Sequence, residues 1–286
     1  MAASTEPEIV LKGGDVIARH ALSTRLWHWI SAAVIVVMLM SGLMIFNAHP
    51  RLYWGSYGAN PDPAWLEIGN ERDQGYLRVG NTTLPTTGVL GLSPGPGDAM
   101  AKLAFPAWAT LPSDYDLSKA RRWHLSFAWL LTAGTLVFGL WSVLNGHLRR
   151  DLLPRASELS PRHIASQLGH HALFRMPCGA AACQYNILQK LVYLGVAGGL
   201  IPIMILSGLT MSPWVNSVAP WLLDLFGGRQ SARSIHFITA FTLVLFVVVH
   251  VVMVVAAGPV NELRSMITGR FRLPRARSAN PEESRE

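Results

Sequence analysis

The sequence predicts an all-α membrane protein whose core is a bundle of four transmembrane helices. Half of the 286 residues are hydrophobic and 14% are charged, whereas ordinary soluble domains carry about 25% charged residues. The mean hydropathy is correspondingly positive, at +0.29. Four apolar runs reach the length of about 20 residues that a helix needs to cross a lipid bilayer. They occupy residues 27–46, 124–144, 187–211 and 235–257.

Each run has a composition suited to lipid. The first reads WHWISAAVIVVMLMSGLMIF and the second HLSFAWLLTAGTLVFGLWSVL. The third, ILQKLVYLGVAGGLIPIMILSGLTM, contains Pro202, which is expected to kink it. The fourth, IHFITAFTLVLFVVVHVVMVVAA, is apolar nearly throughout and yet contains two histidines. Intramembrane ionisable side chains are costly to bury and usually functional, so these histidines require an explanation.

The basic residues indicate how the bundle is oriented. Cytoplasmic loops carry an excess of Lys and Arg, and such residues precede the first run, separate the second from the third, and follow the fourth. These regions share one side of a four-span bundle, so both termini are expected in the cytoplasm, with the bundle in a bacterial inner membrane. Arg121, Arg122, Arg229 and Arg233 oppose this orientation. The net charge of +7 does not indicate nucleic acid as a partner, because no dense basic stripe with interleaved aromatic residues occurs.

The segments outside the runs differ in character. The first outer loop is too long for a simple connector, so we expect a small folded cap or a docking surface for another protein. The tail from Arg272 onward is expected to be disordered, and the polar N-terminus does not resemble a signal peptide. The predicted segments are a cytoplasmic N-terminal segment 1–26, a transmembrane domain 27–257 with periplasmic loops 47–122 and 212–234 and a cytoplasmic loop 145–186, and a cytoplasmic tail 258–286.

The sequence shows no catalytic constellation. Neither a nucleophile beside a base nor a phosphate-binding glycine loop occurs. Cys178 and Cys183 lie close together, but a closed zinc site needs more ligands nearby, so they are interpreted as reduced thiols in a loop. No catalytic residue is therefore expected in this chain.

Four histidines lie in or at the edges of the runs, and their depths match in pairs. His236 and His250 are 14 residues apart, which corresponds to about 21 Å along a helix and only about 40° around it. Because consecutive helices alternate in direction, His28 lies at about the depth of His250, and His124 at about the depth of His236. One pair is expected near the inner face of the membrane and the other near the outer face.

Two facing imidazoles can clamp a flat macrocycle between helices. Neutral imidazole is a strong axial ligand of haem iron, and a protein that supplies both axial ligands favours electron transfer over ligand binding. His28 and His250 are therefore expected to hold an inner haem, and His124 and His236 an outer haem. The alternative for any one of them is a hydrogen-bonded structural histidine.

Glycines at matching depths support the haem interpretation, because a wedged porphyrin needs close approach of the backbone. Gly42 and Gly208 are at the depth of the outer pair, and Gly139 and Gly195 nearer the inner pair. The sequence LMSGLM around Gly42 has a similar counterpart, ILSGLT, around Gly208. The alternative is ordinary packing of small residues between membrane helices.

The stretches RLWHW, RRWH, YNILQKLVY, LSGLTMSPW and GGRQSARSIHF with its following VVVH resemble the prokaryotic di-haem membrane cytochromes b. These are the integral subunits of formate dehydrogenase N, nickel–iron hydrogenases and thiosulfate reductase. The resemblance covers all four runs and implies two haems b with the same pairing of histidines. It also implies a quinone, ubiquinone or menaquinone, near the inner haem. The YNxxQK motif of the family matches this chain at Tyr185 to Lys190, which places Asn186 and Gln189 as candidate quinone ligands. The alternative for these two is capping of the helix or contact with water.

The predicted function is therefore electron transfer between the membrane quinone pool and a periplasmic redox protein. The resemblance implies a molybdopterin-containing oxidoreductase as that partner. One alternative is a stand-alone membrane haem oxidoreductase acting on a small periplasmic substrate such as superoxide or ferric ion. Another is a haem-free anchor or transporter. Arg25, Arg122, Arg229 and Arg233 are expected either to pair with haem propionates or to anchor the helices at the interface.

Overall fold

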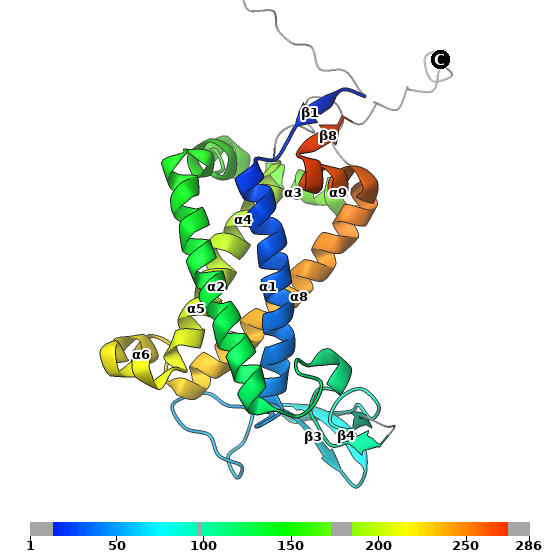
Figure 1. The fold of residues 1–286 in the computed structure, drawn as a ribbon, viewed down its shortest axis with the longest axis vertical. Coiled ribbons are helices and arrows are strands. Elements are labelled where there is room, and N and C mark those ends of the chain that lie inside the picture. Colours follow the sequence, from blue (N-terminus) through cyan, green and yellow to red (C-terminus); the bar gives the residue numbers. More distant parts are fainter. Residues whose placement is uncertain (1–13, 96–98, 173–184, 274–286) are drawn as a thin grey trace, which may run out of the picture. The chain divides into compact units, whose positions relative to one another are not determined.

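The computed structural model describes residues 14–95, 99–172 and 185–273, and Cys178 and Cys183 lie outside them. Four helical spans are long and apolar enough to cross a membrane, as predicted. Three are continuous: α1 (Leu22–Phe46), α2 (Leu117–Leu144) and α8 (Arg229–Ala257) (Figure 1). Each begins earlier than its apolar run, because the polar turns LSTR, LSKARR and RQSARS continue the helix.

The third span, for which a kink at Pro202 was predicted, changes its helix type just before that residue. It consists of α4 (Ile187–Gly195), a π-helical turn at Val196–Leu200, and α5 (Ile201–Thr210). Pro202 lies in the first turn of α5, where its missing N–H is not needed by the preceding helix. A π-helical turn beside proline is a common cause of a kink.

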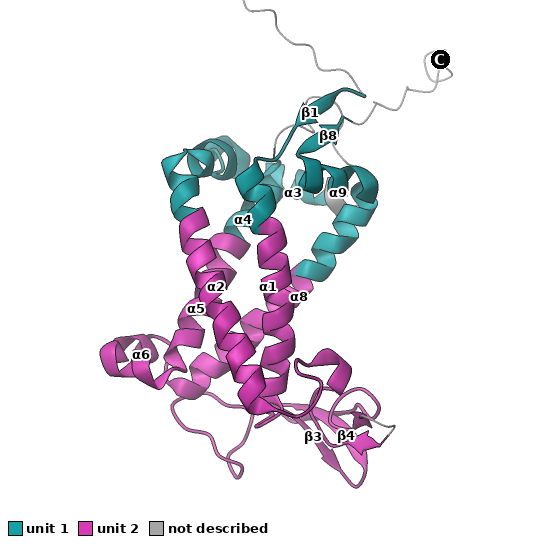
Figure 2. Cartoon of the chain, viewed as in Figure 1, with its two compact units in different colours: residues 1–27, 139–195, 247–286 teal, residues 28–138, 196–246 magenta. Residues whose placement is uncertain are grey.

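The chain divides into two compact units, and the division falls within every span (Figure 2). One unit contains residues 1–27, 139–195 and 247–286, and the other residues 28–138 and 196–246. The second unit, which contains His124 and His236, is called the cap unit below because it includes the first outer loop. The first is called the terminal unit because it includes both chain ends.

The loop 47–122, predicted to be periplasmic, contains a folded cap, built on an antiparallel sheet in the order β2-β3-β4-β5. Its strands are β2 (Arg51–Leu52), β3 (Leu66–Glu71), β4 (Gln74–Val79) and β5 (Thr82–Pro85). A second small sheet pairs β6 (Ser93–Pro94) with β7 (Met100–Ala101). Arg72 and Asp73 turn the β3–β4 hairpin with positive φ angles, as a tight hairpin of this type requires.

Apolar packing holds the cap against the helices. Leu52, Ile68 and Phe105 form a buried cluster with Phe46 at the end of α1, and Phe237 of α8 packs on it. Polar bonds add to the joint: the Asn47 side chain both donates to the Phe105 carbonyl at 3.2 Å and accepts from its amide at 2.8 Å. The cap is therefore part of the same folded body as the neighbouring ends of α1 and α8.

A buried carboxylate organises the cap sheet. Glu67 is 9% exposed at its side chain and accepts hydrogen bonds from Arg51, Tyr76 and Arg78 at 2.5 to 3.1 Å. Burial alone would raise the pKa of Glu67, but the hydrogen bonds from Tyr76 and Arg51 outweigh it, and the pKa lies below its usual value. The ionised carboxylate is therefore part of the folded cap.

The predicted loop 212–234 is mostly helical. It contains α6 (Pro213–Val218), α7 (Pro220–Leu225) and the first turns of α8. Trp214, Val218, Trp221 and Leu225 are exposed on the two short helices. These side chains make an exposed apolar surface on α6 and α7.

In the terminal unit, the two chain ends pair with each other. β1 (Val16–Ala18) lies antiparallel to β8 (Arg270–Arg272), and α9 (Pro259–Thr268) precedes β8. The expectation of disorder from Arg272 onward is wrong at its start, because Arg272 belongs to a strand and Leu273 is 1% exposed. The predicted loop 145–186 contains α3 (Pro161–Ala172).

Candidate functional site

His124 of α2 and His236 of α8 face each other inside the cap unit. Their ring centroids lie 6.3 Å apart, with the ring planes at 63°. Two imidazoles bound to one metal ion would have centroids about 6.4 Å apart, since metal–nitrogen bonds are about 2.0–2.1 Å and the ring centre lies about 1.1 Å beyond the nitrogen. The observed separation matches that arrangement.

Each imidazole is held through its Nδ1 atom by a neighbouring helix. Nδ1 of His124 lies 3.2 Å from Ser41 Oγ and 3.1 Å from the Met38 carbonyl oxygen, both on α1. Nδ1 of His236 lies 3.0 Å from Ser207 Oγ on α5, and the backbone of Met204 also hydrogen-bonds this ring. The two rings thus have the same kind of support from two different helices.

These contacts decide which ring nitrogen carries the proton. Ser41 Oγ donates its one hydrogen to the Val37 carbonyl at 2.7 Å, and Ser207 Oγ donates to the Ile203 carbonyl at 2.6 Å. Each serine oxygen, like the backbone carbonyl beside it, is then an acceptor toward the histidine. Nδ1 must therefore carry the hydrogen in both rings, which leaves the lone pair on Nε2, the nitrogen available to a metal.

Two of the four predicted glycines lie against these imidazoles. A Cβ atom added at Gly42 would be 3.3 Å from Cε1 of His124, and one added at Gly208 would be 3.3 Å from Cε1 of His236. A Cβ atom added at Gly139 or Gly195 would meet nothing within 4 Å. The sequence suggested that these glycines lie against a macrocycle. In the structure, the close neighbour of Gly42 and Gly208 is the imidazole ring itself.

The inner histidines fall in different units, so their pairing stays a prediction. His28, in the cap unit, has its ring edge-on to Trp29 with centroids 5.0 Å apart. His250, in the terminal unit, is half-buried on α8.

The two candidate quinone residues cap a helix. The Asn186 amide donates to Gln189 Oε1 at 3.1 Å, and the Gln189 amide donates to Asn186 Oδ1 at 2.9 Å. This reciprocal pair is a capping box at the start of α4, the structural alternative weighed from the sequence. Beside it, the Tyr185 hydroxyl lies 3.3 Å from His20 Nδ1, and burial raises the pKa of Tyr185 to about 12. Tyr185 is therefore a neutral phenol at physiological pH.

Comparison with known proteins identifies the family. The sequence model of the prokaryotic cytochrome b561 family matches residues 19–269. The chain belongs to this family. It is thus a multi-pass bacterial membrane haem protein of the cytochrome b561 type, and the resemblance seen in the sequence is confirmed.

Curated relatives of this cytochrome are subunits of larger enzymes. It is 28% identical to a putative protein-methionine-sulfoxide reductase subunit, YedZ1, of Azospira oryzae, over 84% of this chain and 91% of the relative. It is 23% identical to a probable Ni/Fe-hydrogenase B-type cytochrome subunit of Azotobacter vinelandii, over 87% and 85% of the two chains. A probable hydrogenase cytochrome subunit of Azotobacter chroococcum is 22% identical, over 79% and 75%. No solved structure matches the chain.

The outer pair of the cytochrome fits haem b. The family implies this cofactor, and His124 and His236, with a lone pair on each Nε2 and ring centroids 6.3 Å apart, are the residues that would hold its iron. No cluster of three or more His, Cys, Asp or Glu side chains suited to a metal ion occurs in the part of the chain that is described.

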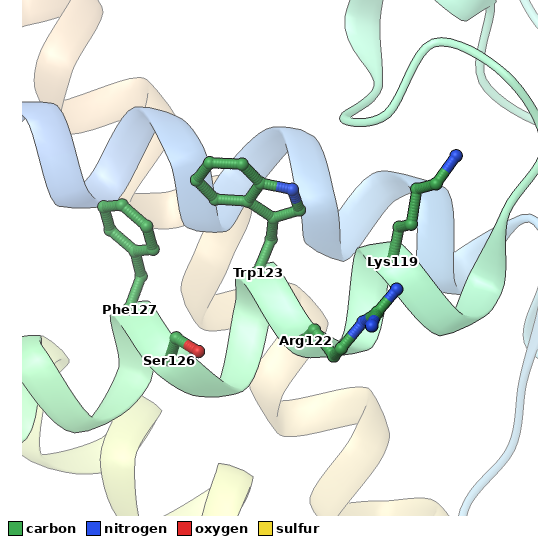
Figure 3. Close-up of a pocket in the computed structure, with 5 residues that line it drawn as sticks. All are labelled: Lys119, Arg122, Trp123, Ser126 and Phe127. Atoms are coloured by element: carbon green, nitrogen blue, oxygen red, sulfur yellow. The ribbon is translucent and has the colours of Figure 1, made fainter.

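Of the arginines considered for haem propionates, Arg233 and Arg122 have contrasting surroundings. Arg233 donates a hydrogen bond to the His49 carbonyl and lies over the Phe46 ring, 5.6 Å from its centroid. Arg122 is exposed and, with four other residues of α2, lines a shallow depression on the surface of that helix (Figure 3). The depression belongs to a single helix, so it is not an enclosed cofactor pocket.

His49 is a half-buried neighbour of Arg233 at the joint between α1 and the cap. Its Nε2 atom is buried without a hydrogen-bond partner among the described residues. Its ring stacks on Tyr53 at 5.8 Å. Burial, then the charges of Arg233 and Arg51, lower the pKa of His49. The ring is therefore neutral in the folded cap.

Sequence reasoning missed Ser41 and Ser207. The signal was present in the repeated text LMSGLM and ILSGLT, where each serine directly precedes a glycine. Only the glycines were interpreted, because a serine in a membrane helix usually satisfies its own backbone. That the same oxygen also meets a histidine of another helix requires the packing to be known.

Proposed function

We propose that this cytochrome transfers electrons across the membrane through two haems b. The outer haem would be held by His124 and His236, and the inner by His28 and His250. The observation that carries the proposal is the outer pair, whose centroids are 6.3 Å apart with both Nδ1 atoms hydrogen-bonded elsewhere. When bound, each haem supplies a one-electron carrier.

The ligand arrangement favours electron transfer over binding of a small ligand. If His124 and His236 both bind one haem iron, they would leave it no open position for oxygen or another substrate, and the haem would supply one-electron transfer. His124 and His236 are also fixed by buried serines, so neither ring is placed to swing away readily. The protein's contribution at this site is to hold the two donor atoms at constant geometry.

A quinone is the proposed membrane partner, near the YNILQK segment. The resemblance of this segment to the family's motif supports it, and both termini and the terminal unit would then face the cytoplasm. The capping box uses the side-chain oxygens of Asn186 and Gln189. The side-chain nitrogen of Gln189, Nε2, takes no part in these two bonds, and it is a suitable donor to a quinone carbonyl. Either ubiquinone or menaquinone presents such a carbonyl.

The proposed soluble partner is a periplasmic redox protein that docks on the cap. Two observations support this: the cap is folded and fixed to the ends of α1 and α8, and the relatives are named as subunits of reductases or hydrogenases. By the resemblance, the partner contains molybdopterin. By the Azospira relative, its substrate class is methionine sulfoxide in proteins. Any substrate chemistry then takes place on the partner.

The test is haem content in single histidine variants of the purified cytochrome. His124→Ala and His236→Ala should each lose one haem of two, while His28→Ala and His250→Ala lose the other. Reduced-minus-oxidised spectra and haem per polypeptide measure this. A wild-type protein without a b-type band, or variants that keep both haems, would refute the proposal. Purification from native membranes tests the partner: a chain that always comes alone and turns over a small substrate would contradict a complex.

A further inference from the structure

We propose that Ser41 and Ser207 are paired positioning residues that set the redox potential of the outer site. This inference rests on the proposed function, since it takes His124 and His236 to be the outer ligands. It adds a role for two residues that do not touch the metal. Each serine is inferred to accept the Nδ1 hydrogen and thereby to increase electron donation from Nε2.

The first serine is placed by its own helix. Ser41 has no exposed surface, and its hydroxyl donates back to the Val37 carbonyl at 2.7 Å. This back-bond uses the hydroxyl hydrogen, so the oxygen is left as an acceptor. His124 Nδ1 is 3.2 Å from that oxygen. The acceptor is therefore ordered before any cofactor binds.

The second serine repeats the arrangement on another helix. Ser207 also has no exposed surface. Its hydroxyl donates to the Ile203 carbonyl at 2.6 Å, and its oxygen is 3.0 Å from His236 Nδ1. In both cases the back-bond is to the residue four positions earlier, and a glycine that seats the imidazole follows directly. The same geometry occurs twice, on two different helices. A serine that only satisfies its own helix backbone does not explain why both oxygens also meet a histidine.

A back-bonded hydroxyl is a stronger acceptor than an isolated one, because hydrogen bonds in a chain polarise one another. A histidine ligand whose other N–H is hydrogen-bonded becomes more basic, and such partners typically change metal affinity or activity about 10- to 100-fold. A more basic ligand stabilises the oxidised iron more than the reduced iron. The two serines should therefore hold the outer midpoint potential below the value that unsupported imidazoles would give.

Removing one serine oxygen should not remove the haem. His124 keeps the Met38 carbonyl as an acceptor at 3.1 Å, and His236 keeps its bond to the Met204 backbone. The Nδ1 hydrogen of His124 thus keeps an acceptor in Ser41→Ala, and the His236 ring keeps a backbone partner in Ser207→Ala. The expected effect is on electron donation, with haem content retained.

The experiment is a redox titration of the purified two-haem cytochrome, followed optically. Ser41→Ala and Ser207→Ala should each raise the outer midpoint about tenfold in equilibrium constant, or about 59 mV for a one-electron couple. The inner midpoint should not move. Ser41→Thr and Ser207→Thr keep a hydroxyl that can make the back-bond, and they should restore the wild-type potential.

A matched control is available on α9. Ser265 is also fully buried and donates back to the Glu262 carbonyl at 2.8 Å, but it makes no hydrogen bond to a histidine in the described residues. Ser265→Ala should leave both potentials unchanged. The outer component is identified by its absence in His236→Ala.

Two outcomes would overturn the inference. One is full haem content with both potentials unchanged in the two alanine variants. The other is an equal shift or equal haem loss in the alanine and threonine variants, which would mean that the serines only fill space. Failure of the proposed function is distinguishable, because His236→Ala would then keep both haems whatever the serine variants do.

Discussion

Gly208 is the position at which the outer site should be most sensitive to a single methyl group. The residue follows Ser207 on α5, and its α-carbon faces the His236 ring. A Cβ atom here would be 3.3 Å from Cε1 and 3.7 Å from Nδ1 of that ring. Carbon atoms pack best at about 3.5–4.0 Å, so in Gly208→Ala the ring must move by a few tenths of an ångström.

The size of the effect follows from that displacement. Overpacking a well-packed site by a methyl group costs about 1–3 kcal/mol, and about 1.4 kcal/mol corresponds to a tenfold change in an equilibrium constant. Haem affinity at the outer site should therefore fall about 5- to 150-fold in Gly208→Ala. Gly208→Val adds two further methyl groups in the same direction and should abolish outer haem binding.

The assay is haem per polypeptide and the optical redox titration, with haem limiting during expression and then in excess. Gly169 supplies the control, because it is exposed on α3 and an added Cβ would meet nothing within 4 Å. Gly169→Ala should leave both haems in place. Full haem content and an unchanged outer potential in Gly208→Val would refute the claim that glycine seats the ligand ring.

Three further predictions concern the cap and the inner side. Glu67→Gln should destabilise the cap by about 2 kcal/mol. This is less than the loss of a fully buried ion pair would cost, because the arginine partners of Glu67 are partly solvated. The cap should then be cut faster by a protease, and an unchanged rate of proteolysis would contradict the prediction. Because the pKa of His49 is lowered in the fold, its stabilising contribution is complete above the unfolded value of about 6.5 and is lost as pH falls below it. Hydrogen exchange of the cap at pH 7.5 and 5.5 should show this loss, and His49→Gln should remove it; a pH response that persists in this variant would assign it to another group. Gln189→Glu keeps the side-chain oxygen that caps α4 but removes the side-chain N–H donor, so the rate of quinol oxidation should fall. Gln189→Ala should lose the cap as well. A normal rate of quinol oxidation in Gln189→Glu would make the residue a helix cap only.

The spans could be predicted because the bilayer imposes a length and a composition that are visible in one sequence. Their starts could not, since the turn RQSARS before the fourth run is polar and yet helical in α8. Hydropathy reports the part of a helix that lipid would surround, whereas a helix continues wherever its backbone bonds are satisfied. The strands of the cap could not be predicted for a different reason. They are only two to six residues long, and the cluster that buries Leu52 and Ile68 includes packing against Phe237, which lies far away in sequence.

The site was predictable to the extent that it depends on spacing along one helix. Helix rise places His124 at the depth of His236 without any knowledge of packing, and the structure brings these two rings together. The roles of the glycines depend on which face of a helix meets which neighbour. Gly42 meets an imidazole and Gly139 meets nothing within 4 Å, and no spacing rule separates the two cases.

The repeated Ser–Gly pair implies that the two outer ligands are equivalent. The Ser41–Gly42 pair joins α1 to the imidazole of α2, and the Ser207–Gly208 pair joins α5 to the imidazole of α8. In both, glycine leaves 3.3 Å between an added Cβ and Cε1, and serine lies 3.2 or 3.0 Å from Nδ1. Substitutions at Ser41 and Ser207 should therefore shift the outer potential by similar amounts. The double variant should shift it further than either single one, and the departure from their sum measures the coupling between the two imidazoles. A large shift from one serine and none from the other would mean that only one imidazole controls the potential, and that the repeat reflects helix packing alone.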